Sequence, residues 1–365
     1  MLKAIFTLDY EIHGNGTGSP LALMIEPTER LLQLFDQYGA KLTIMADIGE
    51  LFKFKQYFED NGRDDYHYEA ITKQLCDAVR RGHDVQLHIH SSYFNARHDK
   101  GYWVQDWSEY DFARLKFDRM DEMVKQGKQF LETLLQPVDP KYKCTVFRAA
   151  NWSVCPSQNV IKALLDNGIE IDTSVFKYGR REGRVNFDYS QSFHQLAPWR
   201  VDEHDICQQN DSGKLWEFPI YTEKRWVGAF LTLQRIYRAY LSRIHKFEDS
   251  SVESNSPETK LPRKSFLERL LNRMTLVFPW KADFNQCSGK QLINALERAH
   301  ANYAHDGVAL PFVLIGHSKL YSHLNEWSLR PFLAHIEKNR ERFDFAKFND
   351  FPLDKALNSP GREHN

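Results

Sequence analysis

The chain has 365 residues, of which 42% are hydrophobic, 13% aromatic and 27% charged. This composition is ordinary for a folded globular protein and excludes a disordered or fibrous chain. The formal net charge of -1 provides no long-range field for nucleic acid or an anionic membrane, so we do not expect a nucleic-acid partner. The five cysteines are far apart and form no CxxC pair, which favours a reducing compartment and argues against a sulfur-ligated metal.

The beginning of the chain is not typical of an exported protein. It reaches Asp9 before the apolar core of a signal peptide could form. No run of residues approaches the roughly 18 consecutive apolar residues of a membrane span. We therefore expect a cytoplasmic protein without a transmembrane segment.

The first predicted elements alternate between strand and helix. Residues 4–8 have the pattern of a buried strand, which stops before the two carboxylates Asp9 and Glu11. A helix is expected over residues 27–38, followed by a second strand over residues 41–46. This alternation is typical of a parallel sheet covered by helices.

The third predicted strand ends in two histidines. A helix over residues 66–81 leads into it, and its apolar residues alternate with polar ones. Because side chains of a strand repeat with a period of two, His88 and His90 point to the same face. Imidazole is the commonest protein ligand for zinc and similar ions, but a site also needs a third ligand, usually a carboxylate, and an open position for water.

Further strand and helix units follow. In chain order they are an aromatic-rich loop (93–107), a long helix (108–135), a strand (144–147), a helix (156–167) and three strands (169–171, 216–220 and 311–315). Arg148, Asp172 and His317 follow three of these strands directly. Repeated units without hairpin signals predict a parallel (β/α) barrel or a doubly wound sheet.

Polar residues gather at the predicted carboxyl ends of the strands. The set comprises Asp9, Glu11, His88, His90, Arg148, Asp172 and His317. Barrel enzymes carry their chemistry at this end of the strands. The coincidence therefore predicts a single catalytic or binding site.

One segment, residues 222–289, breaks the rhythm and is predicted to be an insertion. It interrupts a single domain over residues 1–350, which a flexible tail over residues 351–365 follows. Residues 226–243 form a basic amphipathic helix, and residues 248–260 are polar, serine-rich and expected to be mobile. Such a helix either packs on the barrel, which is the commoner case, or touches a membrane surface or a lipid-linked substrate.

The collected residues suit the hydrolysis of an amide or an ester. If one carboxylate and the two histidines hold a divalent ion, the ion lowers the pKa of bound water and polarises a carbonyl. The other carboxylate of the Asp9 and Glu11 pair then acts as general base, and His317 protonates the leaving amine. Arg148 either orients the base or forms a structural ion pair with Asp172. In a simpler alternative, the two carboxylates only cap the following loop.

Aromatic side chains have two readings. Trp152, Trp199 and Trp216 either line a sugar-binding cleft or belong to the core. The histidines away from the predicted strand ends receive no role.

Five motifs together resemble those of the polysaccharide deacetylase family, the carbohydrate esterases with a NodB-like domain. Residues 7–11 look like its Thr-Phe-Asp-Asp strand end, residues 82–88 its Gly-His-Glu-Ile-Gly-Asn-His motif, residues 147–151 its arginine motif, residues 168–174 its Gly-x-x-x-Asp-Ser-Ser segment and residues 313–317 its Leu-x-x-His motif. The matches follow in the same order over about residues 1–220 and 290–350. The resemblance implies a distorted (β/α) barrel that removes an N- or O-acetyl group from a sugar with the help of a metal.

The resemblance also implies roles for individual residues. Asp9 is expected to be the base, His317 the acid and Arg148 a further catalytic residue, while Glu11, His88 and His90 are expected to hold a divalent ion, with zinc favoured. The expected substrate-binding residues are Asn151, Trp152, Asp172 and Trp216.

Two positions depart from the family pattern. Tyr10 stands where the family usually has a second aspartate, so the metal carboxylate is assigned to Glu11. Ser92 stands where the family has its second metal histidine, so either His90 replaces that histidine or the site has lost its ion.

We therefore expect a cytoplasmic sugar deacetylase that acts on a nucleotide- or lipid-linked glycan precursor in surface polysaccharide assembly. One alternative is a metal-independent C–N hydrolase of the allantoinase-like type. Another is a catalytically silent glycan-binding barrel that holds its sugar with the aromatic loop over residues 93–107.

Overall fold

The computed structural model describes residues 1–12, 18–245, 277–305 and 307–353. The serine-rich segment over residues 248–260 lies outside the described residues, and so does the predicted tail from residue 354 onward.

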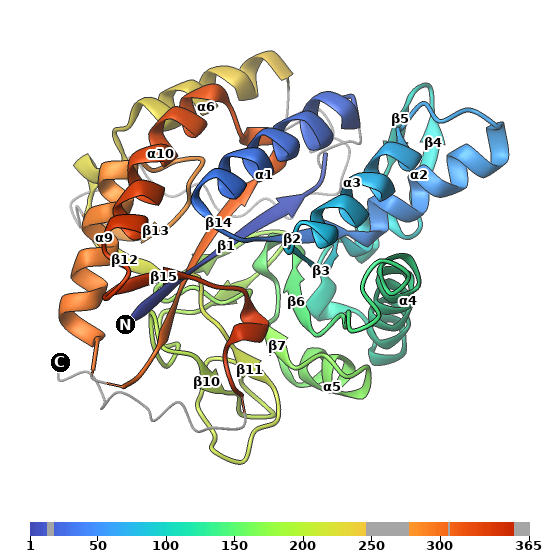
Figure 1. Cartoon of the computed structure of the whole chain (residues 1–365). Helices are drawn as coiled ribbons and strands as arrows, with labels where there is room; N and C mark the ends of the chain where they lie inside the picture. Colours follow the sequence, from blue (N-terminus) through green and yellow to red (C-terminus); the bar gives the residue numbers. More distant parts are fainter. Residues whose placement is uncertain (13–17, 246–276, 306, 354–365) are drawn as a thin grey trace, which may run out of the picture.

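A curled, mostly parallel sheet forms the centre of the protein (Figure 1). Its strands pair in the order β10-β11-β7-β6-β3-β2-β1-β14, and β15 also pairs with β1. Their bounds are β1 Leu2–Tyr10, β2 Leu42–Asp47, β3 Asp84–Ile89, β6 Val146–Ala149, β7 Ile171–Asp172, β10 Trp199–Arg200, β11 Trp216–Glu217, β14 Leu310–His317 and β15 Phe343–Phe345. Only β10 runs antiparallel to its neighbour.

The sheet closes where the chain just beyond β11 pairs with β14. Ile220 pairs with Val313 of β14, and the Tyr221 N–H donates to the Val313 carbonyl at 3.1 Å. The predicted distorted (β/α) barrel is therefore confirmed. Strands β7, β10 and β11 contain only two residues each, so the barrel is irregular on that side.

Helices cover the outside of the sheet (Figure 1). They are α1 Glu26–Tyr38, α2 Ile48–Asn61, α3 Tyr68–Arg80, α4 Phe117–Leu135, α5 Gln158–Asp166, α9 Gly289–Tyr303 and α10 His323–Lys338. In α3 the buried residues Ile71, Leu75 and Ala78 repeat every three or four positions, so one face packs on the sheet while the other meets solvent. Gly39 ends α1 in the left-handed conformation, with φ of 65°, as glycine commonly does after a helix.

Two predicted details of the helices were wrong. The long helix begins at Phe117 rather than at residue 108, because short 3-10 turns occupy Trp107–Glu109 and Phe112–Arg114 and Leu115 is extended. Helix α2 was not predicted. It begins after Asp47, whose side chain accepts a hydrogen bond from the Gly49 N–H and so caps the helix.

The expectation that the chain lacks hairpins was also wrong. Among the described residues, three antiparallel pairs lie outside the main sheet: β4 Arg97–Asp99 with β5 Tyr102–Val104, β8 Arg180–Arg181 with β9 Phe187–Asp188, and β12 Thr222–Trp226 with β13 Val277–Lys281. The first turns at Lys100 and Gly101, which both have positive φ. A Lys-Gly pair is a weaker hairpin signal than Asn-Gly or Asp-Gly, and the strands are short.

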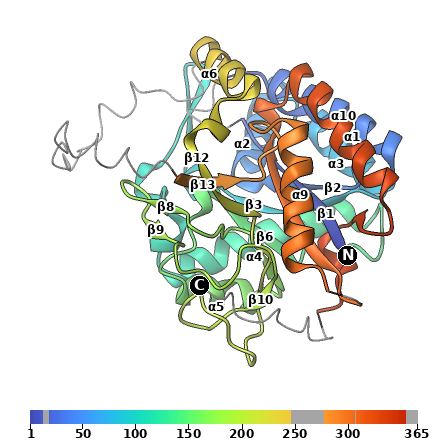
Figure 2. The same ribbon diagram turned by 90° about the vertical axis from the view of Figure 1, so that its left-hand side faces the viewer.

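The β12–β13 hairpin carries the predicted insertion, and Figure 2 shows α6 (Leu233–His245) above it. The basic helix begins at Leu233 rather than at residue 226, because Val227–Phe230 form a 3-10 turn. Among the described residues, no helix is both long and apolar enough to cross a membrane.

Candidate functional site

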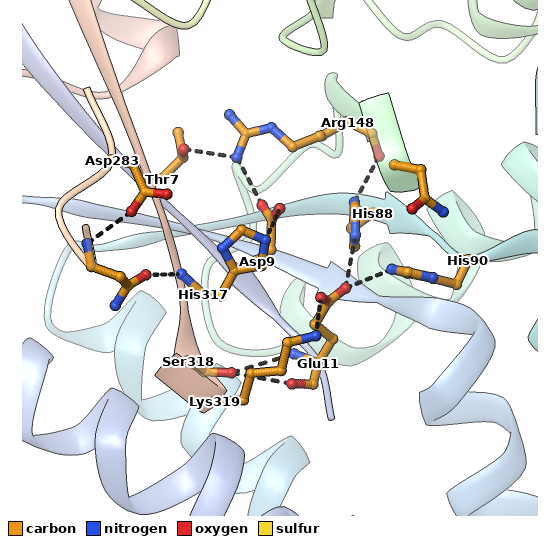
Figure 3. A network of polar contacts seen from close by, with 12 residues as sticks. Thr7, Asp9, Glu11, His88, His90, Arg148, Asp283, His317, Ser318 and Lys319 are labelled. Carbon is orange, nitrogen blue, oxygen red and sulfur yellow. Dashed lines mark hydrogen bonds and ion pairs between the residues drawn. The ribbon is translucent and has the colours of Figure 1, made fainter. Parts of the chain in front are cut away.

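Strand pairing gathers the predicted polar residues at the carboxyl edge of the sheet (Figure 3). Asp9 of β1 stands opposite His317 of β14, and His88 of β3 stands opposite Arg148 of β6. Because these strands are parallel neighbours in one sheet, residues more than 300 positions apart in the chain meet at one place. Glu11 follows β1 directly and lies among them.

Glu11 contacts His88 of β3 and His90, which directly follows that strand. Its Oε2 lies 3.2 Å from Nε2 of His88 and 2.6 Å from Nε2 of His90. One ligand atom of each residue falls within 4.8 Å of the other two, and all three side chains are buried. Burial raises the pKa of Glu11, but Lys319 and His90 outweigh burial and hold that pKa well below its ordinary value.

The other ring nitrogen of His88 fixes its orientation. Nδ1 lies 2.8 Å from the carbonyl oxygen of Arg148, which can only accept, so Nδ1 carries a proton and Nε2 faces Glu11. Burial lowers the pKa of His88, but the hydrogen bond with Glu11 and the charge of Asp9 outweigh it and raise the pKa to about 9.

Lys319 is a member of the site that the sequence analysis did not assign. Its Nζ donates to Oε1 of Glu11 at 2.7 Å, and both side chains are buried. Lys319 lies two residues after His317, so its position just after a predicted strand could have indicated a role in the site.

Arg148 and Asp9 form a second, adjacent cluster. The fully buried Arg148 donates from Nη1 to Oδ1 of Asp9 at 2.8 Å and to Oγ1 of Thr7 at 2.8 Å, and from Nε to the carbonyl of Thr173 at 2.9 Å. Burial raises the pKa of Asp9, but the charges of Arg148 and His88 more than offset it, so that pKa is lowered. The alternative in which Arg148 pairs with Asp172 was wrong, because its ion pair is with Asp9.

His317 lies on the other side of Asp9. Its Nε2 is 3.5 Å from Oδ2 of Asp9, and burial lowers its pKa, which favours the neutral ring. The backbone N–H of His317 donates to Oδ1 of Asn285 at 2.6 Å, which positions the end of β14. Asn285 lies in the return from the insertion, so no local pattern marked it.

The four expected substrate-binding residues divide into two pairs. Asn151 and Trp152 are partly exposed in the turn after β6. Asp172 is fully buried, and its carboxylate accepts from the N–H and Oγ of Ser174. Trp216 is only 6% exposed and belongs to the core cluster. The structure thus brings the first pair, but not the second, to an accessible surface.

Other aromatic residues considered for sugar contact are interior. Trp199 is buried and donates from Nε1 to the Ile206 carbonyl at 3.0 Å. In the aromatic loop, Tyr93 is buried and Trp103 packs beside Tyr66 with ring centroids 5.6 Å apart. These rings fill the core, so this part of the loop offers no aromatic platform.

Glu11, His88 and His90 fit a divalent ion by the chemistry of their donors. Two imidazoles and a carboxylate are ligands that zinc prefers, and a carbonyl bonded to the far nitrogen of a ligating histidine is a common supporting contact. Ser92 is buried and donates to Oε1 of Gln105 at 2.7 Å, so its side chain is engaged away from the triad. The second histidine of the candidate ligand set is therefore His90, and Ser92 takes no part in it.

No protein-family profile and no curated protein sequence matches this chain. Solved structures are similar in fold. A putative glycoside hydrolase/deacetylase from Parabacteroides distasonis is 9% identical with a TM-score of 0.54, over 96% of this chain and 69% of that one. A putative polysaccharide deacetylase from Mycobacterium smegmatis is 13% identical with a TM-score of 0.47, over 96% and 88%. A probable polysaccharide deacetylase from Pseudomonas aeruginosa is 12% identical with a TM-score of 0.45, over 96% and 89%.

Of these, the Parabacteroides distasonis structure supports the same kind of fold as the distorted barrel described above. At this identity the likeness shows the fold alone, and the activity has to be argued from the site.

Proposed function

We propose that this protein is a hydrolase that removes an acetyl group from an acetylated sugar. The observation that carries the proposal is the meeting of two clusters at one strand edge, Asp9 with Arg148 and His317, and Glu11 with His88 and His90. A base, an acid and a set of metal-ligand side chains side by side are what amide hydrolysis requires.

Asp9 acts as general base in this proposal. The ion pair with Arg148 keeps its carboxylate charged and oriented, with Oδ1 engaged and Oδ2 directed at His317. Asp9 takes a proton from the attacking water and passes it to neutral His317, whose Nε2 lies 3.5 Å away, and His317 delivers it to the leaving amine or alcohol. When bound by Glu11, His88 and His90, a divalent ion such as zinc would lower the pKa of water and polarise the acetyl carbonyl.

The substrate is proposed to be an N- or O-acetylated sugar that is nucleotide- or lipid-linked, in surface polysaccharide biosynthesis. The absence of a membrane-spanning helix among the described residues is compatible with work in the cytoplasm on such a precursor. The insertion carries exposed apolar residues, including Trp226, Leu231 and Leu233, which would suit peripheral contact with a membrane.

The direct test is acetate release from N-acetylated and O-acetylated sugars by purified protein. We expect turnover by the wild type and a loss of about 10²- to 10⁴-fold in Asp9→Asn and in His317→Ala, the range for removal of a general acid or base. Release that survives both substitutions would contradict the assigned roles.

A metal-independent C–N hydrolase is the second candidate, and one observation favours it. Lys319 pairs with Glu11 and Arg148 with Asp9, so each of these buried carboxylates already has a cationic partner supplied by the protein. Metal analysis of protein purified without chelator, beside a His88→Ala, His90→Ala variant, separates the candidates. About one equivalent of a divalent ion, lost in the variant, supports the metal-dependent hydrolase. Undiminished turnover in excess chelator supports the second candidate.

A further inference from the structure

The turn after β6 is held in an unusual backbone conformation beside the site. Asn151 and Trp152 are consecutive non-glycine residues with φ of 55° and 57°. Side chains rarely adopt this region, and such residues persist where the surroundings hold them, often at functional sites. Here the hydroxyl of Tyr189 donates to the carbonyl of Trp152 at 2.5 Å and accepts from the N–H of Val154.

The side chain of Asn151 is fixed with a donor left over. Its Oδ1 accepts from Nη1 of Arg181 at 2.9 Å and from the hydroxyl of Tyr110 at 3.3 Å. Because Oδ1 is the acceptor, Nδ2 is the donor end, and this buried nitrogen has no acceptor among the described residues. A buried donor without an acceptor is costly, so an oxygen of a ligand would be stabilised there.

Two more cations surround the same turn. Nζ of Lys281 lies 3.3 Å from the centroid of the Trp152 ring. The guanidinium of Arg184 lies 5.6 Å from the ring of Tyr110, the residue that holds Asn151. Arg181 of the β8–β9 hairpin and Lys281 of β13 thus bring positive charges from two segments to this turn, although the whole chain carries a net charge of only -1.

We infer that Asn151, Arg181 and Lys281 form a subsite for a phosphate group attached to the sugar that is hydrolysed. The inference rests on the proposed function for the sugar and goes beyond it in naming the charged group. Guanidinium forks and an amide N–H suit phosphate oxygens, and Lys281 adds a further positive charge. Asn151 follows Arg148 by three residues, and Arg148 contacts Asp9, so this turn begins next to the site.

The test is binding by calorimetry, with full-length protein and two probes that differ only in phosphate. We expect N-acetylglucosamine 1-phosphate to bind at least tenfold more tightly than N-acetylglucosamine. Asn151→Gly keeps the backbone, because glycine adopts positive φ without strain, and removes the donor. This variant and Arg181→Met should each lose most of the preference.

Arg180→Met is the matched control. Arg180 neighbours Arg181 on β8 but pairs with Asp188 at the surface, so its loss should leave the preference intact. Equal affinity for the two probes, or equal effects of Arg180→Met and Arg181→Met, would overturn the inference. Circular dichroism verifies folding of each variant.

The outcomes separate this inference from the proposed function. A preference for the phosphorylated probe without acetate release would support the phosphate subsite and contradict the proposed deacetylase function. Acetate release without a phosphate preference does the opposite. Two further probes identify the source of the phosphate: UDP-N-acetylglucosamine, and an N-acetylglucosamine pyrophosphoryl prenol in detergent micelles. Tighter binding of either one supports the subsite and names its carrier, whereas weak binding of both counts against it.

Discussion

The two ends of strand β3 carry histidines in opposite electrostatic states. His83, just before the strand, accepts at Nδ1 from the Leu42 N–H at 3.1 Å and lies 3.0 Å from Asp36 through Nε2. Burial, only partly offset by Asp36, lowers its pKa to about 4. His88 instead donates at Nδ1 to a carbonyl, and its pKa is raised to about 9. The Nδ1 atom accepts a hydrogen bond in His83, outside the site, and donates one in His88, within the site.

The other buried polar groups at the two ends of β3 also differ, in whether they have hydrogen-bond partners. At the amino end, Oε1 of Gln86 accepts from the N–H groups of Thr145 and Val146, and Nε2 donates to Asp84. At the carboxyl end, buried polar atoms without partners among the described residues include Nδ1 of His317 and Oδ2 of Asp47. Buried polar groups that are all hydrogen-bonded stabilise the fold, whereas buried groups without partners are available to hydrogen-bond a ligand.

The largest expected effect compares buried aspartates at the two ends. Asp9→Asn should lower acetate release by about 10²- to 10⁴-fold, because the general base is lost. Asp84→Asn, whose carboxylate bonds Gln86 and Val85, should change activity less than about twofold and act only on stability, as mutations of structural groups do. Assays at saturating substrate decide it, and an equal loss in both variants would remove the functional distinction between the ends.

Arg148→Met should be the most destabilising single change at the carboxyl end. It leaves the Asp9 carboxylate buried without its cation, at a cost of about 3 to 5 kcal/mol in the free energy of unfolding. Adding Asp9→Asn should recover part of that cost. The partly exposed Arg81, which pairs with Asp36 and Glu29, is the control, and Arg81→Met should cost about 1 kcal/mol. Urea unfolding measures all three variants; a cost for Arg148→Met no greater than the control would contradict the account.

His83 should make stability depend on pH in a defined window. Its pKa is about 4 when folded and near 6.5 when unfolded, so the unfolded state binds more protons between these values. Stability from this group is therefore complete above pH 6.5 and falls as the pH drops toward 4. The loss from pH 7 to 4.5 should be about 2 to 3 kcal/mol larger in the wild type than in His83→Gln. Parallel pH dependence of the two proteins would show that His83 is not held neutral.

The smallest effect is expected at an exposed pair on α3. Nζ of Lys73 lies 2.6 Å from Asp77, but 76% of the lysine side chain is exposed. Lys73→Ala should therefore cost less than about 0.5 kcal/mol, and added salt should reduce that cost further. Urea titrations at low and high salt test this. A cost that rivals that of Arg148→Met would mean that burial does not set the scale.

Local patterns were sufficient for the regular part of the fold. A run of apolar residues marked β1 and alternating apolar residues marked β3, while helical periodicity marked α1 and α3 to within two residues of their observed bounds. The short hairpins β4–β5 and β8–β9 were missed, because strands of two or three residues carry almost no periodic signal. Helix α2 was missed as well.

The strand-end residues were predictable because their chemistry and position appear in the sequence itself. Asp9, Glu11, His88, Arg148 and His317 follow apolar strand patterns, and parallel pairing places such ends together. Their partners were not predictable in this way. Which carboxylate Arg148 binds depends on a contact 139 positions away in the chain.

The sequence by itself determined the alternation of strands and helices, the edge at which polar residues collect and the types of ligand available there. Only the tertiary structure decided that Lys319 neutralises Glu11, that Asn285 holds His317 and that Ile220 closes the barrel on Val313. The physical reason is the separation along the chain of the residues that interact. Strand and helix patterns arise from neighbours within a few residues, whereas buried charges find their partners through packing between segments that are distant in the chain.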